Sequence, residues 1–400
     1  MLVLGIESSC DDTSVALVDC SDRGHVIIAE KMASQIDIHT KYGGVVPEIA
    51  GRMHAEKIVP LIEEVMNEGN KEIKKQGNSE TVDKLIHPDV IAVTAGPGLI
   101  TGLIVGVEAA RTLSYAWNIP LIAVNHIEGH IHSVEISNNK FQISSFQSGN
   151  ANKIQNPKSK NDSSAPYSLL PTPLIDFPAL CLVVSGGHTE LISMKDHGDY
   201  KILGSTKDDA AGECFDKVAK LLGLPYPGGP QISRLAMSGR TDAINFPRPM
   251  LKEKNFDFSF AGLKTAALYW LRDNAQTDSS TYHLPPTGLA DFCASFEQAI
   301  VDVLVGKALR AAEEIKPKTI ILAGGVAANK KLRETLGAHI QYRNSDEQPF
   351  APIIYLLPTT SYAMDNGAMI AVAGYYHAIK KEFTDWDKIT VDPNWKIEKL

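Results

Sequence analysis

Two histidines, His126 and His130, have the spacing of a metal-binding pair. They stand four residues apart, and residues at i and i+4 lie on one face of a helix. Two imidazoles on one face can bind a single metal ion. Glu128 is two residues from each histidine and therefore faces the other way, unlike the general base in the H-E-x-x-H pattern of zinc peptidases. From spacing alone, a capping or surface pair remains the alternative.

A metal site needs a third ligand, and Asp365 is a candidate. It lies near the start of a small-residue segment that predicts a helix over 362–379, where the helix dipole favours a carboxylate. Two histidines and one carboxylate would leave coordination positions open for substrate oxygens, as a catalytic metal site requires. A plain helix-capping role for Asp365 is the alternative.

Glycine-rich loops are a second feature with chemical potential. Residues 185–189 (Ser-Gly-Gly-His-Thr) and 322–329 (Leu-Ala-Gly-Gly-Val-Ala-Ala-Asn) each follow a buried apolar run, and residues 226–230 (Tyr-Pro-Gly-Gly-Pro) form a third turn. Glycine lets backbone N–H groups approach a phosphate or a base without a Cβ clash. Three such loops favour a nucleotide site, although neither a P-loop motif nor a Rossmann motif occurs.

Acidic residues surround the first predicted turn and begin a later helix. Glu7, Asp11 and Asp12 flank that turn, and one of them could orient a nucleophile or accept a proton. Turns also favour Asp for conformational reasons alone. Asp216 and Lys217 stand on a predicted helix, where they could face a cleft or form an ordinary surface ion pair.

The elements that must position these residues repeat along the chain. Residues 2–19 and 179–196 each contain an apolar run, a small polar turn ending in Thr and a second apolar run, which predicts a hairpin. Strands and helices alternate after each hairpin, which predicts an α/β fold of two related lobes. The expected strands are 25–33, 89–94, 120–124, 200–204, 319–322 and 353–356, and the expected helices are 45–66, 102–117, 211–222, 288–314, 327–336 and 362–379.

The pattern also suggests how the chain is divided. Residues 67–85 and 137–176 are polar and lack periodicity, so we expect inserted loops, the second of them disordered. The expected division is a first lobe over 1–124, a metal-bearing helix between the lobes over 125–136, the disordered insertion over 137–176, and a second lobe over 177–400 whose 362–379 helix packs back toward the first lobe.

Composition excludes several classes of protein. The chain has 400 residues, of which 44% are hydrophobic and 22% charged, as in ordinary globular proteins of about two domains. Five scattered cysteines without a C-x-x-C pair argue against a disulfide framework. No apolar run reaches the roughly 20 residues of a membrane span, and no leader pattern precedes the first strand, so we expect a cytoplasmic protein with no membrane contact.

The net charge of −8 means that the chain as a whole is not a basic nucleic-acid binder. Contact with RNA would need a local patch or a basic partner. The candidate cations are Lys41, Arg52, Lys57, Arg240, Arg248, Lys252, Lys254 and Lys264.

Taken together, these motifs resemble the universal tRNA N6-adenosine threonylcarbamoyltransferase family in its bacterial form. The resemblance covers most of the chain, and the order of so many motifs makes chance a poor explanation. The motifs are residues 5–13, 43–48, 95–98, 126–130, 184–189, 215–217, 226–230, 258–265, 323–329 and the segment around Asp365.

The resemblance implies an actin-like ATPase fold, with two lobes around a nucleotide cleft. It also implies that His126, His130 and Asp365 bind one divalent metal ion, described in the family as iron, with zinc as the alternative. The activated substrate would be threonylcarbamoyl-adenylate, held by Val183, Val184, Ser185, Gly186, Gly187, Asp216, Gly229 and Asn329.

The implied reaction transfers the threonylcarbamoyl group to N6 of the adenosine beside the anticodon, in tRNAs that read codons beginning with A, and releases AMP. Asp11 is our candidate for the group that orients or deprotonates the attacking amine. The implied protein partners are a dimerising paralogue and a small ATPase.

The chain departs from the family pattern at Ser233, where some relatives have Asp, and at Ala363, where Cys is frequent; the 137–176 insertion is also long. Three alternatives remain: a metallopeptidase, an ATP-dependent sugar kinase of the same fold class, and a non-catalytic paralogue that serves as a scaffold.

Overall fold

The two predicted hairpins are present, and each forms the middle of a sheet. β1 (Leu2–Glu7) pairs antiparallel with β2 (Asp12–Ser21), and β7 (Ala179–Val184) pairs antiparallel with β8 (Thr189–Asp196). The structure is a computed structural model that describes residues 1–76, 86–137, 175–278, 281–344 and 352–399.

Both main sheets have the same plan among these residues. The first has the strand order β5-β4-β1-β2-β3-β6 and the second β13-β12-β7-β8-β9. In each, an antiparallel three-stranded unit is extended by parallel strands next to its first strand. The other strands of these sheets are β3 (Gly24–Ser34), β4 (Val90–Gly96), β5 (Leu121–Asn125), β6 (Ile136–Ser137), β9 (Asp199–Ser205), β12 (Thr319–Ala323) and β13 (Ile354–Leu356). Separately, β10 (Gln276–Asp278) pairs antiparallel with β11 (Thr281–His283).

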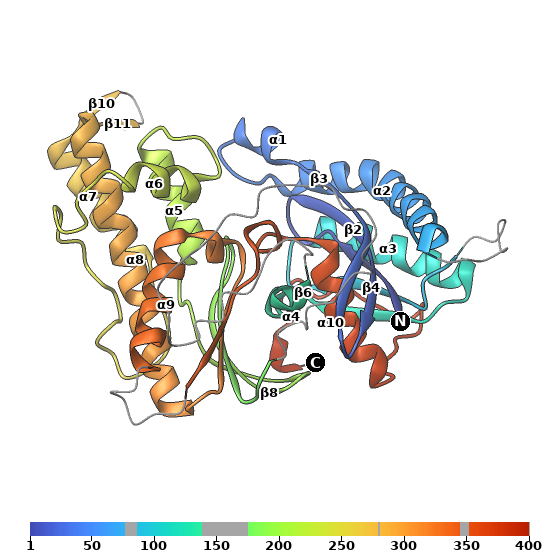
Figure 1. Cartoon of the computed structure of the whole chain (residues 1–400). Coiled ribbons are helices and arrows are strands. Elements are labelled where there is room, and N and C mark those ends of the chain that lie inside the picture. The colour runs from blue at the N-terminus through green and yellow to red at the C-terminus, as the bar shows by residue number, and fades with distance from the viewer. Residues whose placement is uncertain (77–85, 138–174, 279–280, 345–351, 400) are drawn as a thin grey trace, which may run out of the picture.

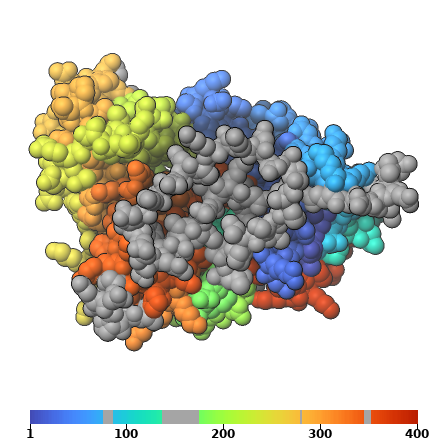
Figure 2. Space-filling view, in the orientation of Figure 1, coloured from blue at the N-terminus to red at the C-terminus, as the bar shows by residue number. Residues whose placement is uncertain are grey.

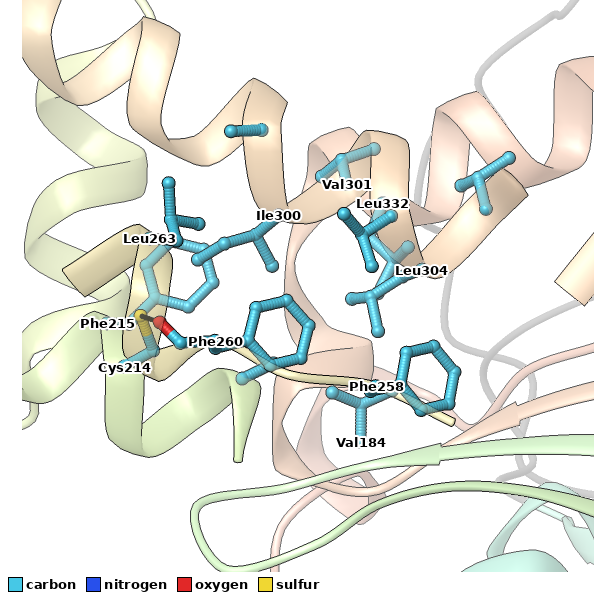
Figure 3. Packing of buried hydrophobic residues seen from close by; sticks show 14 of the residues in the cluster. Val184, Cys214, Phe215, Phe258, Phe260, Leu263, Ile300, Val301, Leu304 and Leu332 are labelled. Carbon is cyan, nitrogen blue, oxygen red and sulfur yellow. Dashed lines mark hydrogen bonds between the residues drawn. The ribbon is translucent and has the colours of Figure 1, made fainter. Parts of the chain in front are cut away.

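Helices cover the outer face of each sheet (Figure 1). On the first sheet these are α2 (Pro47–Gln76) and α3 (Ile100–Trp117), which bury one apolar cluster. On the second sheet a larger cluster includes six buried phenylalanines, of which Figure 3 labels Phe215, Phe258 and Phe260. Its helices are α5 (Ala211–Leu221), α6 (Gly228–Ala236), α7 (Ala261–Asn274), α8 (Pro286–Ile315) and α9 (Lys330–Arg343).

Two helices form a layer between the inner faces of the sheets. α10 (Gly367–Ile379) packs on the first sheet, and α4 (His126–His132) inserts Ile127 and Ile131 into a cluster on the second. α10 approaches β1 so closely that a Cβ on Gly5 would lie 2.0 Å from the carbonyl oxygen of Gly367. Figures 1 and 2 accordingly show the red C-terminal part of the chain beside the blue N-terminal part.

The remaining helical elements are short. They are α1 (Ile36–Thr40) and the 3₁₀ turns η1 (Ser133–Glu135), η2 (Gly325–Ala328), η3 (Thr360–Tyr362) and η4 (Ile397–Lys399). Across the part of the chain that the structure describes, no helix is both long and apolar enough to cross a membrane.

Several predicted boundaries are wrong, among them the end of the helix predicted over 327–336, which continues to Arg343. Residues 67–76 are not loop, because α2 continues to Gln76 and buries Asn70, whose side chain hydrogen-bonds Met66 and Ile86. The helix predicted over 362–379 begins at Gly367, and the one predicted over 327–336 begins at Lys330. Each starts late because an Asn side chain caps it, Asn366 and Asn329 respectively. Most of the predicted 137–176 insertion, from 138 to 174, lies outside the described residues.

Candidate active site

The three predicted metal ligands lie together in the layer between the sheets. Asp365 Oδ1 is 3.2 Å from His130 Nε2 and 3.6 Å from His126 Nε2. The two imidazole rings are 4.6 Å apart, and one ligand atom from each residue lies within 4.8 Å of the others. His130 and Asp365 are 235 positions apart in the sequence, and they meet because α10, which follows Asp365, packs beside α4.

Local structure explains why each ligand faces the others. α4 begins directly after β5, and the side chain of Asn125 caps it by accepting a hydrogen bond from Ile127 N at 3.0 Å. His126 and His130 are then one turn apart on one face of the helix. Asp365 immediately precedes Asn366, the cap of α10, so its carboxylate stands at the positive end of that helix.

A carboxylate that sequence reasoning did not assign holds His126 in place. Glu7, at the end of β1, accepts hydrogen bonds from His126 Nδ1 at 3.0 Å, Ser9 N at 2.5 Å and Thr94 Oγ1 at 2.7 Å. With Nδ1 donating to Glu7, His126 turns its other ring nitrogen, Nε2, toward Asp365. A carboxylate behind a histidine is the usual support for a metal ligand. No local pattern links Glu7 to a residue 119 positions away.

The electrostatics of His126, His130 and Asp365, which we call the triad, favour a bound cation. Burial works against charge on His126, but the negative charges of Glu7 and Asp365 outweigh it and raise its pKa to about 9. Burial likewise opposes ionisation of Asp365, yet the neighbouring His126 and His130 hold its pKa well below the usual range.

The donor set fits a metal ion. His130 is fully buried, and among the described residues its Nδ1 has no hydrogen-bond partner, while its Nε2 faces Asp365 Oδ1 at 3.2 Å. An unpartnered buried nitrogen is costly unless a ligand satisfies it. Two imidazoles and one carboxylate are a donor set found for zinc and for non-haem iron.

The glycine loop between β7 and β8 lies near this triad. Ser185 and His188 close the loop through a backbone hydrogen bond of 2.8 Å, while Gly186 and Gly187 face open space. Burial, with a smaller contribution from the charges of His126 and His130, lowers the pKa of His188 to about 4. His188, which had no predicted role, is therefore close enough to interact electrostatically with the metal ligands.

The two valines predicted to hold substrate contribute differently. Val183 and Val184 are fully buried strand residues, and Val184 packs into the phenylalanine cluster (Figure 3). Their side chains support the loop, and only their backbone groups could reach a ligand.

Other glycines bring further loops to the same place. A Cβ on Gly212 would lie 2.9 Å from Cα of Gly186, and one on Gly325 would lie 3.3 Å from Sδ of Met364, the neighbour of Asp365. Glycine-rich segments from three parts of the second lobe therefore converge beside the triad.

The remaining predicted substrate residues hold loops of the second lobe. Asp216 Oδ1 accepts the N–H groups of Gly228 at 2.7 Å and Gly229 at 3.3 Å, which ties α5 to the start of α6. Asn329 donates to Ser233 Oγ at 2.9 Å and Glu297 Oε1 at 2.7 Å. Glu297, in the middle of α8, had no signal that distinguished it from other helical acids.

Asp11 lies on the first lobe and faces the second. Burial raises its pKa, and the negative charge of Asp365 adds to the effect. Asp11 also interacts electrostatically with Tyr226 and Asp216 of the second lobe. The lobes touch here, since Thr40 Oγ1 donates a 3.1 Å hydrogen bond to the carbonyl oxygen of Tyr226.

A second group with metal-ligand chemistry is His132, Glu135 and His197. Here His132 has partners on both nitrogens, Glu135 Oε2 at 2.5 Å from Nδ1 and the Tyr200 hydroxyl at 3.1 Å from Nε2. Because these bonds already satisfy His132, the group is better described as a hydrogen-bond network.

Comparison with known proteins places the chain in a family. The family model described as "tRNA N6-adenosine threonylcarbamoyltransferase" matches residues 26–155 and 165–372. The chain belongs to this threonylcarbamoyltransferase family. Relatives with the same name include proteins from Chromobacterium violaceum (42% identical; 100% of this chain and 99% of the relative) and Bacillus subtilis (44% identical; 94% and 90%).

Solved structures support the fold. The crystal structure of T. kodakarensis HypF superposes with a TM-score of 0.54 at 12% identity, covering 98% of this chain and 49% of the HypF chain, so the chain spans about half the length of HypF. The predicted α/β fold of two related lobes is confirmed, and it is the actin-like fold of the threonylcarbamoyltransferase family.

Proposed function

We propose that the protein transfers a threonylcarbamoyl group from threonylcarbamoyl-adenylate to N6 of the adenosine beside the anticodon, in tRNAs that read codons beginning with A, and releases AMP. Family membership over nearly the whole chain supports the proposal. The structural observation that carries it is the triad of His126, His130 and Asp365 beside the open glycine loop at Gly186 and Gly187.

The donor would bind along the glycine-rich segments. Backbone N–H groups at Ser185, Gly186 and Gly187 can approach the phosphate of the adenylate because no Cβ stands in the way. Asp216, Gly229 and Asn329 would hold the nucleoside, with Asp216 and Asn329 already bonded to the loops that surround it. Ser233 would take the position where some relatives have Asp.

The triad would hold one divalent metal ion, iron or zinc. When bound there, such an ion would polarise oxygens of the donor and make the carbamoyl carbon more electrophilic. Glu7 would keep the proton of His126 on Nδ1 and so keep Nε2 available as a ligand.

The transfer step makes one bond and breaks one. N6 of adenosine attacks the carbamoyl carbon, the new C–N bond forms, the bond from that carbon to the phosphate oxygen breaks, and AMP leaves. Asp11 would take the proton that N6 loses. An adenine amine is a weak nucleophile, so holding it close to the carbamoyl carbon would supply much of the acceleration.

Recognition of tRNA would need a composite surface, because the net charge of −8 opposes phosphate binding. Of the candidate cations, Arg240, Arg248 and Lys264 form ion pairs with carboxylates of the same chain. Lys41, Arg52 and Lys57 of the first lobe and Lys252 and Lys254 of the second are exposed and are the stronger candidates. A dimerising paralogue and a small ATPase would complete the assembly, in the cytoplasm.

The alternatives receive less support. A peptidase would need a general base at the metal, and both oxygens of Glu128 are bonded elsewhere, to Tyr200 and His377. A sugar kinase would have no use for the metal ligands His126, His130 and Asp365. A scaffold paralogue would not need to retain these three residues.

The test is transfer of labelled threonylcarbamoyl from its adenylate to tRNA, with metal analysis of the same sample. We expect His126→Ala to lose both the metal and the transfer. His283→Ala, which changes an exposed histidine on β11, is the control and should keep both. Full transfer by metal-free protein would overturn the proposal.

A further inference from the structure

Glu128 is a buried carboxylate that the proposed chemistry does not use. It lies between the two candidate metal ligands of α4 and has no exposed surface. Its Oε1 accepts a 2.9 Å hydrogen bond from the hydroxyl of Tyr200, on β9. Its Oε2 accepts a 2.8 Å bond from His377 Nε2, near the end of α10. One side chain therefore joins α4 to the second sheet and to the helix on the first.

The hydrogen bond between His377 and Glu128 is strong because both partners are ionised. His377 Nδ1 also donates to Glu382 Oε2 at 2.6 Å, so both ring nitrogens carry a proton and the ring is positively charged. Hydrogen bonds between ionised partners are about twice as strong as neutral ones. Tyr200 is similarly fixed, because its oxygen also contacts His132 Nε2 at 3.1 Å.

The same two helices carry the metal ligands. His126 and His130 belong to α4, and Asp365 leads into α10, so the distances within the triad depend on how α4 lies against α10. The helices pack tightly, since a Cβ on Gly129 would lie 2.7 Å from Cδ1 of Ile370. Asp365 meets α4 at the start of α10, and His377 meets it near the end.

We propose that Glu128 is a positioning residue, which fixes α4 against α10 and β9 so that His126 and His130 stay within coordination distance of Asp365. α4 has only seven residues, all of them buried, so a small rotation of this helix would move both histidines relative to Asp365. Without the carboxylate, α4 would keep its apolar packing and the bond of His126 to Glu7, but it would lose the two bonds that Glu128 makes to Tyr200 and His377. The inference rests on the proposed function, because it assumes that the triad binds a metal ion.

The experiment compares zinc affinity in three variants of the full chain, without donor or tRNA, by competition with a fluorescent chelator. Glu128→Gln removes the charge, Tyr200→Phe removes one hydrogen bond and keeps the ring, and Glu382→Gln is the matched control. Glu382 contacts the same His377 but is half exposed, and its Gln variant keeps a side-chain oxygen that can accept from Nδ1, so His377 can still donate from Nε2 to Glu128. Thermal unfolding of the metal-free proteins reports folding separately.

We expect Glu128→Gln to weaken zinc binding about tenfold, the lower end of effects seen for outer-shell changes, and Tyr200→Phe to weaken it less. Glu382→Gln should stay within about twofold. The transfer reaction of Glu128→Gln should regain activity at high zinc, which a misfolded protein would not do.

Equal zinc affinity in Glu128→Gln and the unmodified chain would overturn the positioning role, as would an equal loss in Glu382→Gln. An unmodified chain that binds neither zinc nor iron would instead remove the metal site, and with it the proposed function.

Discussion

Replacing Glu7 by Gln should weaken metal binding while leaving the fold intact. All three partners of Glu7 act as donors toward it: Ser9 N, Thr94 Oγ1 and His126 Nδ1. A carboxylate accepts from all of them, whereas an amide has one accepting oxygen and one donating nitrogen. Whichever way the amide turns, its nitrogen faces either Ser9 N or His126 Nδ1.

The size of the effect follows from that mismatch. A buried donor left without an acceptor costs about 1–3 kcal/mol. If the amide nitrogen faces His126, the ring can avoid the cost by moving its proton to Nε2, the nitrogen that points at Asp365, and then cannot bind a metal. Since about 1.4 kcal/mol is a factor of ten, we expect the dissociation constant for zinc to rise roughly 10- to 100-fold, in the range known for such changes.

The assay is chelator competition with zinc, and Thr94→Val is the matched control. That variant removes one donor from Glu7 but leaves the carboxylate and its bond to His126, so its affinity should change less than about threefold. Unchanged affinity in Glu7→Gln would refute the reasoning, and an equal loss in Thr94→Val would show that general disturbance of the site is the cause.

Three further predictions follow from individual residues. Asp11→Asn should lower kcat of transfer about 10²- to 10⁴-fold with little change in KM for the adenylate, and unchanged kcat would exclude Asp11 as the proton acceptor. Gly324→Ala should lower the free energy of unfolding by about 3 kcal/mol, because φ is +87° and the new Cβ would lie 2.5 Å from the carbonyl oxygen of Val184. Gly262→Ala, with open space around its Cβ, is the control. Equal denaturation midpoints for the two variants would contradict the argument. At His377, burial disfavours the charged ring, but two carboxylates outweigh it and raise the pKa to about 9 from 6.5. The resulting stabilisation, about 3 kcal/mol, should be complete below pH 6.5 and lost as the pH rises to 9. Denaturation at several pH values checks this, and His377→Gln should abolish that part of the pH dependence.

The order of secondary-structure elements could be predicted from the sequence because it depends on local patterns. Alternating apolar residues and small polar turns indicated β1 with β2 and β7 with β8, and the structure confirms both hairpins. Boundaries were less predictable. Polar residues after Met66 suggested a loop, yet α2 continues to Gln76, because Ile73 packs on the first-sheet core.

The candidate site was also only partly predictable. The pairing of His126 with His130 follows from helical periodicity. Asp365 was a candidate because it precedes a predicted helix, and the family resemblance implied the same residue. The function of Glu7 was not predictable, although Glu7 stood among the acids of the first turn. Its bond to His126 exists only because β4 lies between β1 and β5 in the first sheet.

The sequence by itself determined the repeated α/β pattern, the family and the chemical types available at the site. Tertiary structure alone decided which of these groups meet. Asp365 reaches the histidines because small residues at Gly5 and Gly367 let α10 approach β1, and Glu128 is turned from the metal ligands toward Tyr200 and His377. Periodicity specifies which face of an element a side chain occupies, but the partner on that face comes from residues more than 70 positions away, and only packing of the whole chain selects it.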